Sequence, residues 1–189
     1  MIKSYSDYKN VIQYENNKCI SIRCLLFPDP TSKLLKQLRK IEWHFNSKGI
    51  IHRILFLFSY LKYRKLSLKT GISIPKNVCD KGLFIPHFGA IVVNANCKIG
   101  RNCMIQNNVN IGTNGGSSTA PKIGNNVYIG PGAVIYGEIE IADNCYIGAN
   151  AVVNKSFLEP NSVIAGVPAK VIKKETQVWW EKNKMQLEK

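Results

Sequence analysis

The chain has 189 residues, enough for one domain with appendages and a sizeable hydrophobic core. It contains 26 Lys and Arg against 12 Asp and Glu, which gives a net charge of +14. No run of 18 or more apolar residues occurs, so no segment is expected to span a membrane. The N-terminal residues lack the apolar core of a signal peptide, and we therefore expect a cytoplasmic protein.

The positive charge is concentrated in the first part of the chain. Residues 1–70 contain 14 basic and 4 acidic residues, a net charge of +10, whereas residues 71–189 contain 12 and 8, a net charge of +4. Such an excess favours anionic partners, namely a phospholipid surface, a nucleic acid or a phosphorylated small molecule. The basic segments lack the interleaved aromatic residues of a base-stacking surface, so a nucleic acid is not expected.

The first predicted helix follows a weakly patterned segment, residues 1–30, which ends in Phe-Pro-Asp-Pro. Thr31 or Ser32 is expected to cap this helix, which should end near Gly49. Its expected apolar face consists of Leu34, Leu38, Ile41 and Phe45. The opposite side, expected to face solvent, carries Lys33, Lys36, Arg39 and Lys40.

A second predicted helix, residues 50–65, is apolar and is surrounded by four basic residues. A pair of basic amphipathic helices can lie on an anionic bilayer, which would put the protein at the inner face of the membrane. The alternative, which we favour, is that the helices pack on each other and on the next part of the chain; both arrangements can hold together. His44 and His52 lie in this region and are not expected to be catalytic.

Between residues 93 and 153, branched aliphatic residues recur with a period of six. This first series consists of Val93, Ile99, Ile105, Ile111, Ile123, Ile129, Ile135, Ile141, Ile147 and Val153. A second series of smaller residues, four positions later in each repeat, consists of Cys97, Cys103, Val109, Val127, Ala133, Ile139, Cys145 and Ala151. A period of six fits neither a helix nor an alternating strand, and it is typical of a parallel β-helix with one large and one smaller inward residue per face.

Glycine often follows the large aliphatic residue, where we expect the backbone to bend or to lack room for a Cβ atom. Residues 113–122 lose both apolar series and are rich in Gly and Ser, which predicts a loop extruded from the coil. Towards the N-terminus, the smaller series continues through Ile91, Ile85 and Cys79, whereas the large series meets His87. The repeat is thus interrupted at His87.

The six cysteines show no CxxC pair, and several belong to the smaller inward series. We expect reduced thiols that behave as small hydrophobic residues, and no metal site. After the repeat, a short helix capped by Thr176 carries Trp179 and Trp180, which we expect to cover the open end of the coil or to form a subunit contact.

The predicted fold is therefore an all-β main domain, a parallel β-helix of hexapeptide repeats, with an N-terminal α-helical extension and a short C-terminal helix. The expected divisions are a basic helical region over residues 1–70, the β-helix over residues 71–173 with its loop at 113–122, and the C-terminal helix over residues 174–189.

Three motifs together resemble the serine O-acetyltransferase-like branch of the hexapeptide-repeat acyltransferases. They are Pro-His-Phe-Gly-Ala-Ile-Val-Val at 86–93, the polar loop that runs into Pro-Lys-Ile-Gly at 121–124, and Ala-Gly-Val-Pro-Ala-Lys at 165–170. The resemblance covers residues 71–173. It implies a left-handed β-helix, a homotrimer with its sites between neighbouring subunits, and acetyl-CoA as the acyl donor.

The chain departs from serine acetyltransferases at the positions with which that family holds the amino acid. Pro86 replaces an aspartate before the histidine, Ile72 replaces an aspartate that pairs with it, and Thr119-Ala120 replaces an Arg-His pair. In these respects the chain resembles the acetyltransferases of capsule, exopolysaccharide and O-antigen synthesis, so we expect a saccharide hydroxyl as acceptor. Serine O-acetyltransferase is the first alternative, and a non-catalytic β-helix scaffold is the second.

His87 is the candidate general base, because acetyl transfer to an alcohol needs a group that accepts the hydroxyl proton near neutral pH. The residues alone are equally compatible with a histidine satisfied at a ragged first turn; the resemblance favours catalysis. Since Ile72 cannot orient the ring, Asp80, a backbone carbonyl or a neighbouring subunit should do so.

By analogy with the family, nine residues are expected to hold acetyl-CoA. They are Gly112, Thr113, Gly130, Pro131, Gly148, Ala149, Ala165, Gly166 and Lys170. The N–H groups of Gly112 and Thr113 would face the thioester carbonyl, and Lys170 would match the charge of the 3′-phosphate. The small residues would let the pantetheine arm approach the backbone. No cysteine has an evident nucleophile setting, so direct transfer is expected.

Overall fold

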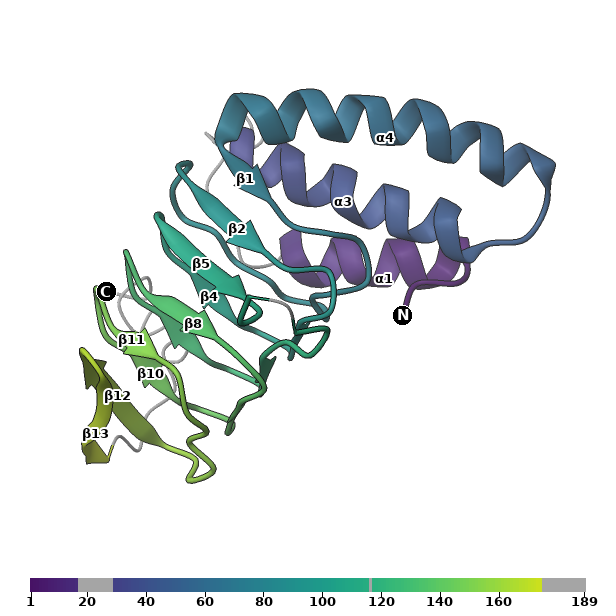
Figure 1. The fold of residues 1–189 in the computed structure, drawn as a ribbon. Helices are drawn as coiled ribbons and strands as arrows, with labels where there is room; N and C mark the ends of the chain where they lie inside the picture. The colour runs from purple at the N-terminus through teal and green to yellow at the C-terminus, as the bar shows by residue number, and fades with distance from the viewer. Residues whose placement is uncertain (17–28, 116, 175–189) are drawn as a thin grey trace, which may run out of the picture.

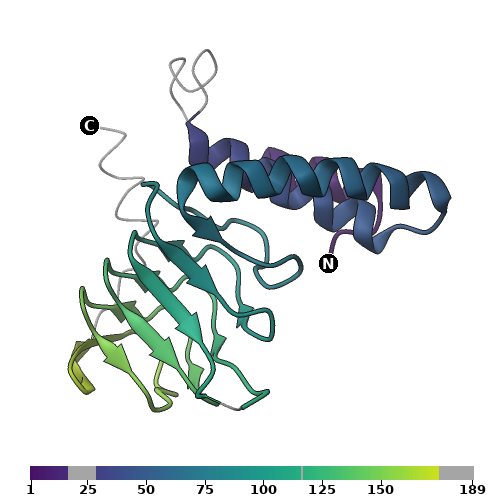
Figure 2. The same ribbon diagram turned by 45° about the horizontal axis from the view of Figure 1, so that its top comes forward.

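The computed structural model describes residues 1–16, 29–115 and 117–174. Its helices are α1 (Tyr5–Asn16), α3 (Pro30–Asn46) and α4 (Ile50–Thr70), which lie across one end of a stack of short strands (Figures 1 and 2). The strands are β1 (Ile72–Ser73), β2 (Ile91–Val93), β3 (Lys98–Ile99), β4 (Met104–Ile105), β5 (Val109–Gly112), β6 (Lys122–Ile123), β7 (Tyr128–Ile129), β8 (Val134–Tyr136), β9 (Glu140–Ile141), β10 (Tyr146–Ile147), β11 (Val152–Val153), β12 (Ser162–Gly166) and β13 (Ala169–Lys174).

The strands form the three faces of a parallel β-helix. The first face has the order β1-β2-β5-β8-β11, the second β3-β6-β9, and the third β13-β12-β10-β7-β4. Every pairing between successive coils is parallel, and only the terminal hairpin of β12 and β13 is antiparallel among the described strands. Because the chain visits the faces in turn, each coil adds one strand to each face.

The two apolar series point into this coil, as the period of six predicts. All ten residues of the large series are buried, and so are all eight of the smaller series. Their stacking forms one continuous core that also includes Leu34, Leu38 and Ile41 of α3. Burial of this apolar surface is the main favourable contribution to the stability of the coil.

Asparagine, and not glycine, provides the left-handed backbone at many of the corners. Asn102, Asn126 and Asn144 have φ values of 57°, 57° and 60°. Asn tolerates this conformation better than most residues. The side-chain amides also form a ladder, in which Asn102 donates to Asn126 at 3.1 Å and Asn126 donates to Asn144 at 2.9 Å.

The register shows where residues are added to the repeat. Lys122 pairs with Glu140, one coil of 18 residues further on, but Lys98 pairs with Lys122, which is 24 residues further on. The six additional residues lie between the end of β5 at Gly112 and the start of β6 at Lys122. This is the segment in which the sequence predicts the extruded loop.

The first coil has a second irregularity, and here the interpretation of the sequence was wrong by two residues. Cys79 bridges to Ile99 and Phe84 bridges to Met104, a step of 20, whereas Ile91 pairs with Val109, a step of 18. The corner between residues 85 and 91 therefore holds two more residues than its counterpart in the next coil. Cys79 consequently stacks on the large series and does not extend the smaller one.

The helical extension differs in detail from the prediction. The cap of α3 is Asp29, whose carboxylate accepts the Thr31 N–H at 3.0 Å, and not Thr31 or Ser32. Helix α1, which the weak pattern of residues 1–30 did not predict, packs on α3 through Tyr5 and Tyr8, whose rings lie 5.2 and 5.3 Å from that of Trp43. Phe45, expected inside, is exposed. The predicted C-terminal helix with its two tryptophans lies outside the described residues.

Arg39, expected on the solvent side of α3, is buried at 2% exposure. Its guanidinium donates to Glu15 of α1 at 2.8 Å and to Glu42 at 2.9 Å, and it also donates to the carbonyl oxygens of Cys79 at 2.8 Å and Asp80 at 2.7 Å. Burial alone would lower the pKa of the guanidinium, but the carboxylates of Glu42 and Glu15 outweigh burial and raise the pKa above its usual value. Arg39 thus connects two helices to the first coil.

Replacing Arg39 with Ala should lower the free energy of unfolding by about 3–5 kcal/mol, because it leaves buried carboxylates without their partner. Urea unfolding followed by circular dichroism measures this change. Lys40→Ala, at the exposed neighbouring position, is the matched control and should change stability by about 0.5 kcal/mol or less. Equal effects of the two substitutions would contradict the role of Arg39.

Candidate functional site

His87 lies on one edge of the β-helix, where the chain passes from the third face to the first. The corners of successive coils at this edge are residues 86–90, 106–108, 130–133 and 148–150, and we call them the His87 edge. The register of β4, β7 and β10 aligns these corners. Gly132 N–H donates to Asn107 O at 3.0 Å, and Asn150 N–H donates to Pro131 O at 2.9 Å, so neighbouring corners are in contact.

The corner that carries His87 is held to the end of α4. Gly89 N–H donates to Thr70 O at 2.9 Å, and Ile91 N–H donates to Gly71 O at 3.1 Å. The two additional residues of this corner give the chain room to protrude, and both His87 and Phe88 are exposed, Phe88 at 64%. An imidazole on a fixed backbone, open to the surface, is accessible to a reactant, as a general base must be.

Glycine allows the backbones of the His87 edge to lie close together. A Cβ atom at Gly130 would lie 2.7 Å from the nitrogen of Ala149, and one at Gly148 would lie 2.9 Å from the Cβ of Ala165. Each glycine is therefore needed at its position, and the edge carries small residues between one coil and the next.

Seven of the nine residues expected to hold the donor occur in one region of the structure. They are Gly130, Pro131, Gly148 and Ala149 on the His87 edge, Ala165 and Gly166 at the end of β12, and Lys170. Lys170 is exposed and pairs with Ala165 across the β12–β13 hairpin. The cation thus lies at the far end of the row that begins at His87.

Gly112 and Thr113 lie elsewhere in the chain. Gly112 ends β5 and pairs with Tyr136, at the opposite end of the first face from the His87 edge. Its carbonyl oxygen accepts the Gly137 N–H at 3.2 Å. A single chain therefore does not bring these two residues to His87.

Asp80 also lies at a different corner from His87, with the third face between the two. Its carboxylate accepts the Lys81 N–H at 2.7 Å, and its carbonyl oxygen accepts from Arg39. Asp80 lines a groove of about 710 Å³ between α1 and the second face of the coil, together with Arg39 and Glu42. Within one chain, Asp80 belongs to the junction between the helices and the coil.

Asn107 is a neighbour of the His87 corner that the repeat pattern does not reveal. A Cβ atom at Gly89 would lie 3.1 Å from the Cβ of Asn107, so the two corners are in contact. The pattern hides this relation because the two additional residues shift His87 out of the period of six. The offset becomes visible only when the first coil is aligned through Cys79 and Phe84.

The cysteines of the described residues are free thiols inside the coil: Cys79, Cys97, Cys103 and Cys145. Burial raises the pKa of Cys79, raises that of Cys97 to about 11 and raises that of Cys145. Raised pKa values keep these thiols protonated and therefore poor nucleophiles. Cys19 and Cys24 lie outside the described residues.

His44 and His52 lie at the distal end of α3 and α4, apart from the His87 edge. Their Nδ1 atoms are 3.1 Å apart. Burial lowers the pKa of His44, and His52 and Lys40 lower it further. Within residues 1–16, 29–115 and 117–174, no group of three His, Cys, Asp or Glu side chains is arranged to hold a metal ion.

Comparison with known proteins gives one family and several solved structures. The family described as bacterial transferase hexapeptide (six repeats) matches residues 120–155. No curated protein matches the chain. Serine acetyltransferase from Brucella abortus strain S19, in complex with coenzyme A, is 26% identical, with a TM-score of 0.71 over 91% of this chain and 70% of that chain.

Two further structures are similar to a comparable degree. Serine acetyltransferase from Neisseria gonorrhoeae, in complex with serine, is 23% identical, with a TM-score of 0.73 over 90% of this chain and 71% of that chain. The enzyme from Vibrio cholerae O1 biovar El Tor N16961 is 20% identical, with a TM-score of 0.75 over 92% and 68%.

These similarities extend over both the helices and the coil, and they support the left-handed β-helix that the resemblance implies. The six-residue repeat, the parallel faces and the family match agree with one another. The chain is an acyltransferase built on bacterial transferase hexapeptide repeats.

Proposed function

We propose that this acyltransferase moves an acetyl group from acetyl-CoA to a hydroxyl group, with His87 as the general base. The observation that carries the proposal is the His87 edge: an exposed imidazole stands at one end of a row of small residues that ends near a lysine. An extended thioester could lie along such a row with its anionic end at Lys170. The similarity to a serine acetyltransferase solved with coenzyme A supports this choice of donor.

In the proposed reaction, the imidazole accepts the proton of the acceptor hydroxyl while the oxygen attacks the thioester carbonyl. Collapse of the tetrahedral intermediate breaks the carbon–sulfur bond, and the imidazolium returns its proton to the leaving CoA sulfur. Histidine suits both steps, since its ordinary pKa of about 6.5 lies close to neutral pH. The buried cysteines have no place in this scheme, because their thiols face the core.

The oxyanion of the intermediate needs hydrogen-bond donors, and we assign this role to the N–H groups of Gly112 and Thr113. They lie at the opposite end of the first face from His87, so a neighbouring subunit must supply them. The proposal therefore includes a homotrimer with its sites between adjacent chains. The same arrangement leaves the orientation of the His87 ring to Asn107, to Asp80 of another subunit or to a backbone carbonyl.

The comparisons favour L-serine as acceptor over the saccharide that the sequence suggested. The structures compared are serine acetyltransferases, and the one from Neisseria gonorrhoeae was solved with serine. They give no support to a capsule or O-antigen acetyltransferase. L-Serine is therefore the acceptor that we propose first.

A saccharide hydroxyl remains the second candidate because of three positions in this chain. Ile72 is fully buried in β1, so it brings no polar group to the site. Pro86 is half-buried beside His87, and Thr119-Ala120 carries no charge. Without the carboxylates and the Arg-His pair, the site offers little to hold a zwitterionic amino acid.

Replacing His87 with Ala should lower kcat by about 10²–10⁴-fold, because the attacking hydroxyl then loses its base. Release of the CoA thiol, followed with a chromogenic disulfide, measures the rate. His52→Ala is the control matched in residue type, since this histidine lies on α4 away from the edge, and it should keep the rate of the unaltered enzyme. Unchanged CoA release in His87→Ala would remove His87 from the mechanism.

The acceptor is tested by comparing CoA release with L-serine and with a panel of neutral and acidic oligosaccharides. We expect kcat/KM for L-serine to exceed that for every saccharide by at least about tenfold, since a site built to hold a given substrate through polar contacts discriminates strongly. L-Alanine, which lacks the hydroxyl, gives the background of thioester hydrolysis. The reverse order of kcat/KM would select the saccharide, and no release with any acceptor, together with no binding of CoA by calorimetry, would favour a non-catalytic scaffold.

A further inference from the structure

Helix α4 presents an apolar surface to solvent along its first three turns. Seven large apolar side chains there are 41–68% exposed, and we call them the α4 ridge: Ile50, Ile51, Ile54, Leu55, Leu57, Phe58 and Leu61. Positions 50, 54, 57, 58 and 61 follow the spacing of one helix face. An exposed apolar surface of this extent is unusual on a protein without a partner and marks an interaction site.

The opposite face of α4 is polar, although it is the face that packs on the rest of the protein. Ser59, Tyr63 and Ser67 are buried there. Gln37 of α3 donates to Ser59 O at 2.9 Å, Tyr63 Oη donates to Ile74 O at 2.5 Å, and Ser67 Oγ donates to Ile72 O at 2.6 Å. Since these bonds fix the rotation of α4 about its axis, the apolar ridge cannot turn inward without breaking them.

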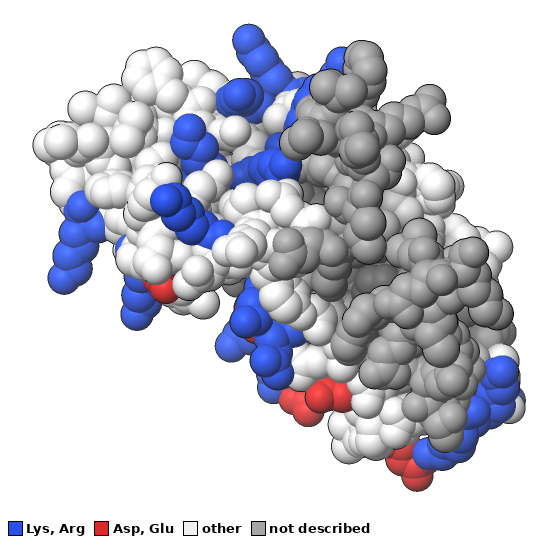
Figure 3. All heavy atoms as spheres, turned by 180° about the vertical axis from the view of Figure 1, so that it is seen from behind, with Lys and Arg blue, Asp and Glu red and all other residues white. Residues whose placement is uncertain are grey.

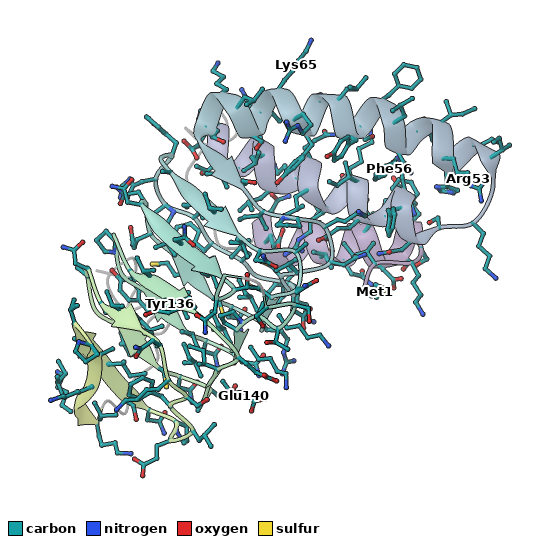
Figure 4. The ribbon with its side chains drawn as sticks, in the orientation of Figure 1. Met1, Arg53, Phe56, Lys65, Tyr136 and Glu140 are labelled. Carbon is teal, nitrogen blue, oxygen red and sulfur yellow. The ribbon has the colours of Figure 1, made fainter. Side chains whose placement is uncertain are left out.

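Basic residues surround the ridge. Helix α4 carries five exposed cations and no acidic residue: Arg53, Lys62, Arg64, Lys65 and Lys69. Figure 4 shows Arg53 at the distal end of the helix and Lys65 pointing away from the fold. In Figure 3 the distal end of the helices is an uncharged surface with Lys and Arg beside it.

We propose that the α4 ridge binds the surface of an anionic phospholipid bilayer. A helix with an apolar face flanked by Lys and Arg inserts that face into the interface while its cations contact lipid phosphates. A second copy of the chain fits less well, because pairing two α4 helices would bring five cations against five with no acidic residue between them. No helix among the described residues is long and apolar enough to cross a membrane, so α4 would lie in the plane of the interface.

This binding is independent of the acetyl transfer proposed above, but it has a consequence for the site. The last residue of α4, Thr70, accepts the Gly89 N–H, two residues from His87. A bilayer that holds α4 therefore also holds the His87 corner at a constant distance from its surface.

Co-sedimentation of the full chain with vesicles tests the proposal without any acyl donor. One set of vesicles contains phosphatidylcholine alone, and the other contains phosphatidylcholine with 30% phosphatidylglycerol, a proportion of about that in anionic bacterial or cytoplasmic-leaflet membranes. We expect sedimentation with the anionic vesicles, at least about tenfold weaker sedimentation with the neutral ones, and loss of binding in high salt.

Two variants separate the apolar and the electrostatic contributions. Leu57→Ser with Leu61→Ser removes part of the ridge, and Lys62→Glu with Lys65→Glu reverses two of its cations; each pair should weaken sedimentation by about tenfold or more. The matched control is Leu158→Ser with Arg101→Glu, an exposed apolar residue and an exposed cation of the coil, and it should sediment like the unaltered chain. All substituted side chains are exposed, and thermal melts followed by circular dichroism verify that each variant is folded.

Three results would overturn the proposal. The first is equal sedimentation with neutral and anionic vesicles, and the second is sedimentation that the α4 variants do not change. The third is a lower mass of the Leu57→Ser, Leu61→Ser variant in light scattering without lipid, because the ridge would then be an interface between copies of this chain. CoA release by the same preparations reports the acyltransferase separately, so failure of either proposal can be recognised independently of the other.

Discussion

The buried guanidinium of Arg39 determines how the helices are placed on the coil. Removing a guanidinium from water is costly unless every charge and donor finds a partner. Arg39 meets this condition with Glu15 of α1, Glu42 of its own helix and two carbonyl oxygens of the first coil. Glu15 and Glu42 in turn accept the N–H groups of Gly82 and Asn77, at 3.0 and 2.8 Å, so both carboxylates also bind the first coil directly.

The first coil is therefore constrained at two places, by this cluster at one corner and by the end of α4 at another. The corner that α4 holds is the one that departs from the repeat, and its two additional residues place His87 at the surface. In the regular coils the corresponding corners are short and consist of small residues. The candidate site thus combines an irregular turn, which exposes the base, with regular turns, along which an extended donor can lie.

The inverted polarity of α4 follows from the same junction. Its polar face satisfies backbone carbonyls at Ser59, Ile72 and Ile74, where an apolar face would leave buried polar groups unpaired. The apolar residues are then left on the outside, beside the basic residues that account for much of the charge of the chain. Helices that join a β-helix in this way can position a site and also present a surface for a partner.

Much of the fold is predictable from the residues, because a period of six with one large and one smaller inward residue is compatible with few structures, and the burial of every member of both series confirms it. The motifs at 86–93 and 165–170 likewise indicated the two ends of the candidate site, while its catalytic assignments stay predictions. The burial of Arg39 and the separation of Asp80 from His87 could not be predicted, since they depend on which face of a helix meets the coil and on a two-residue shift of register. Local pattern specifies which residues face inward, whereas contacts between distant segments specify which corners meet; the latter depend on long-range packing that no periodicity encodes.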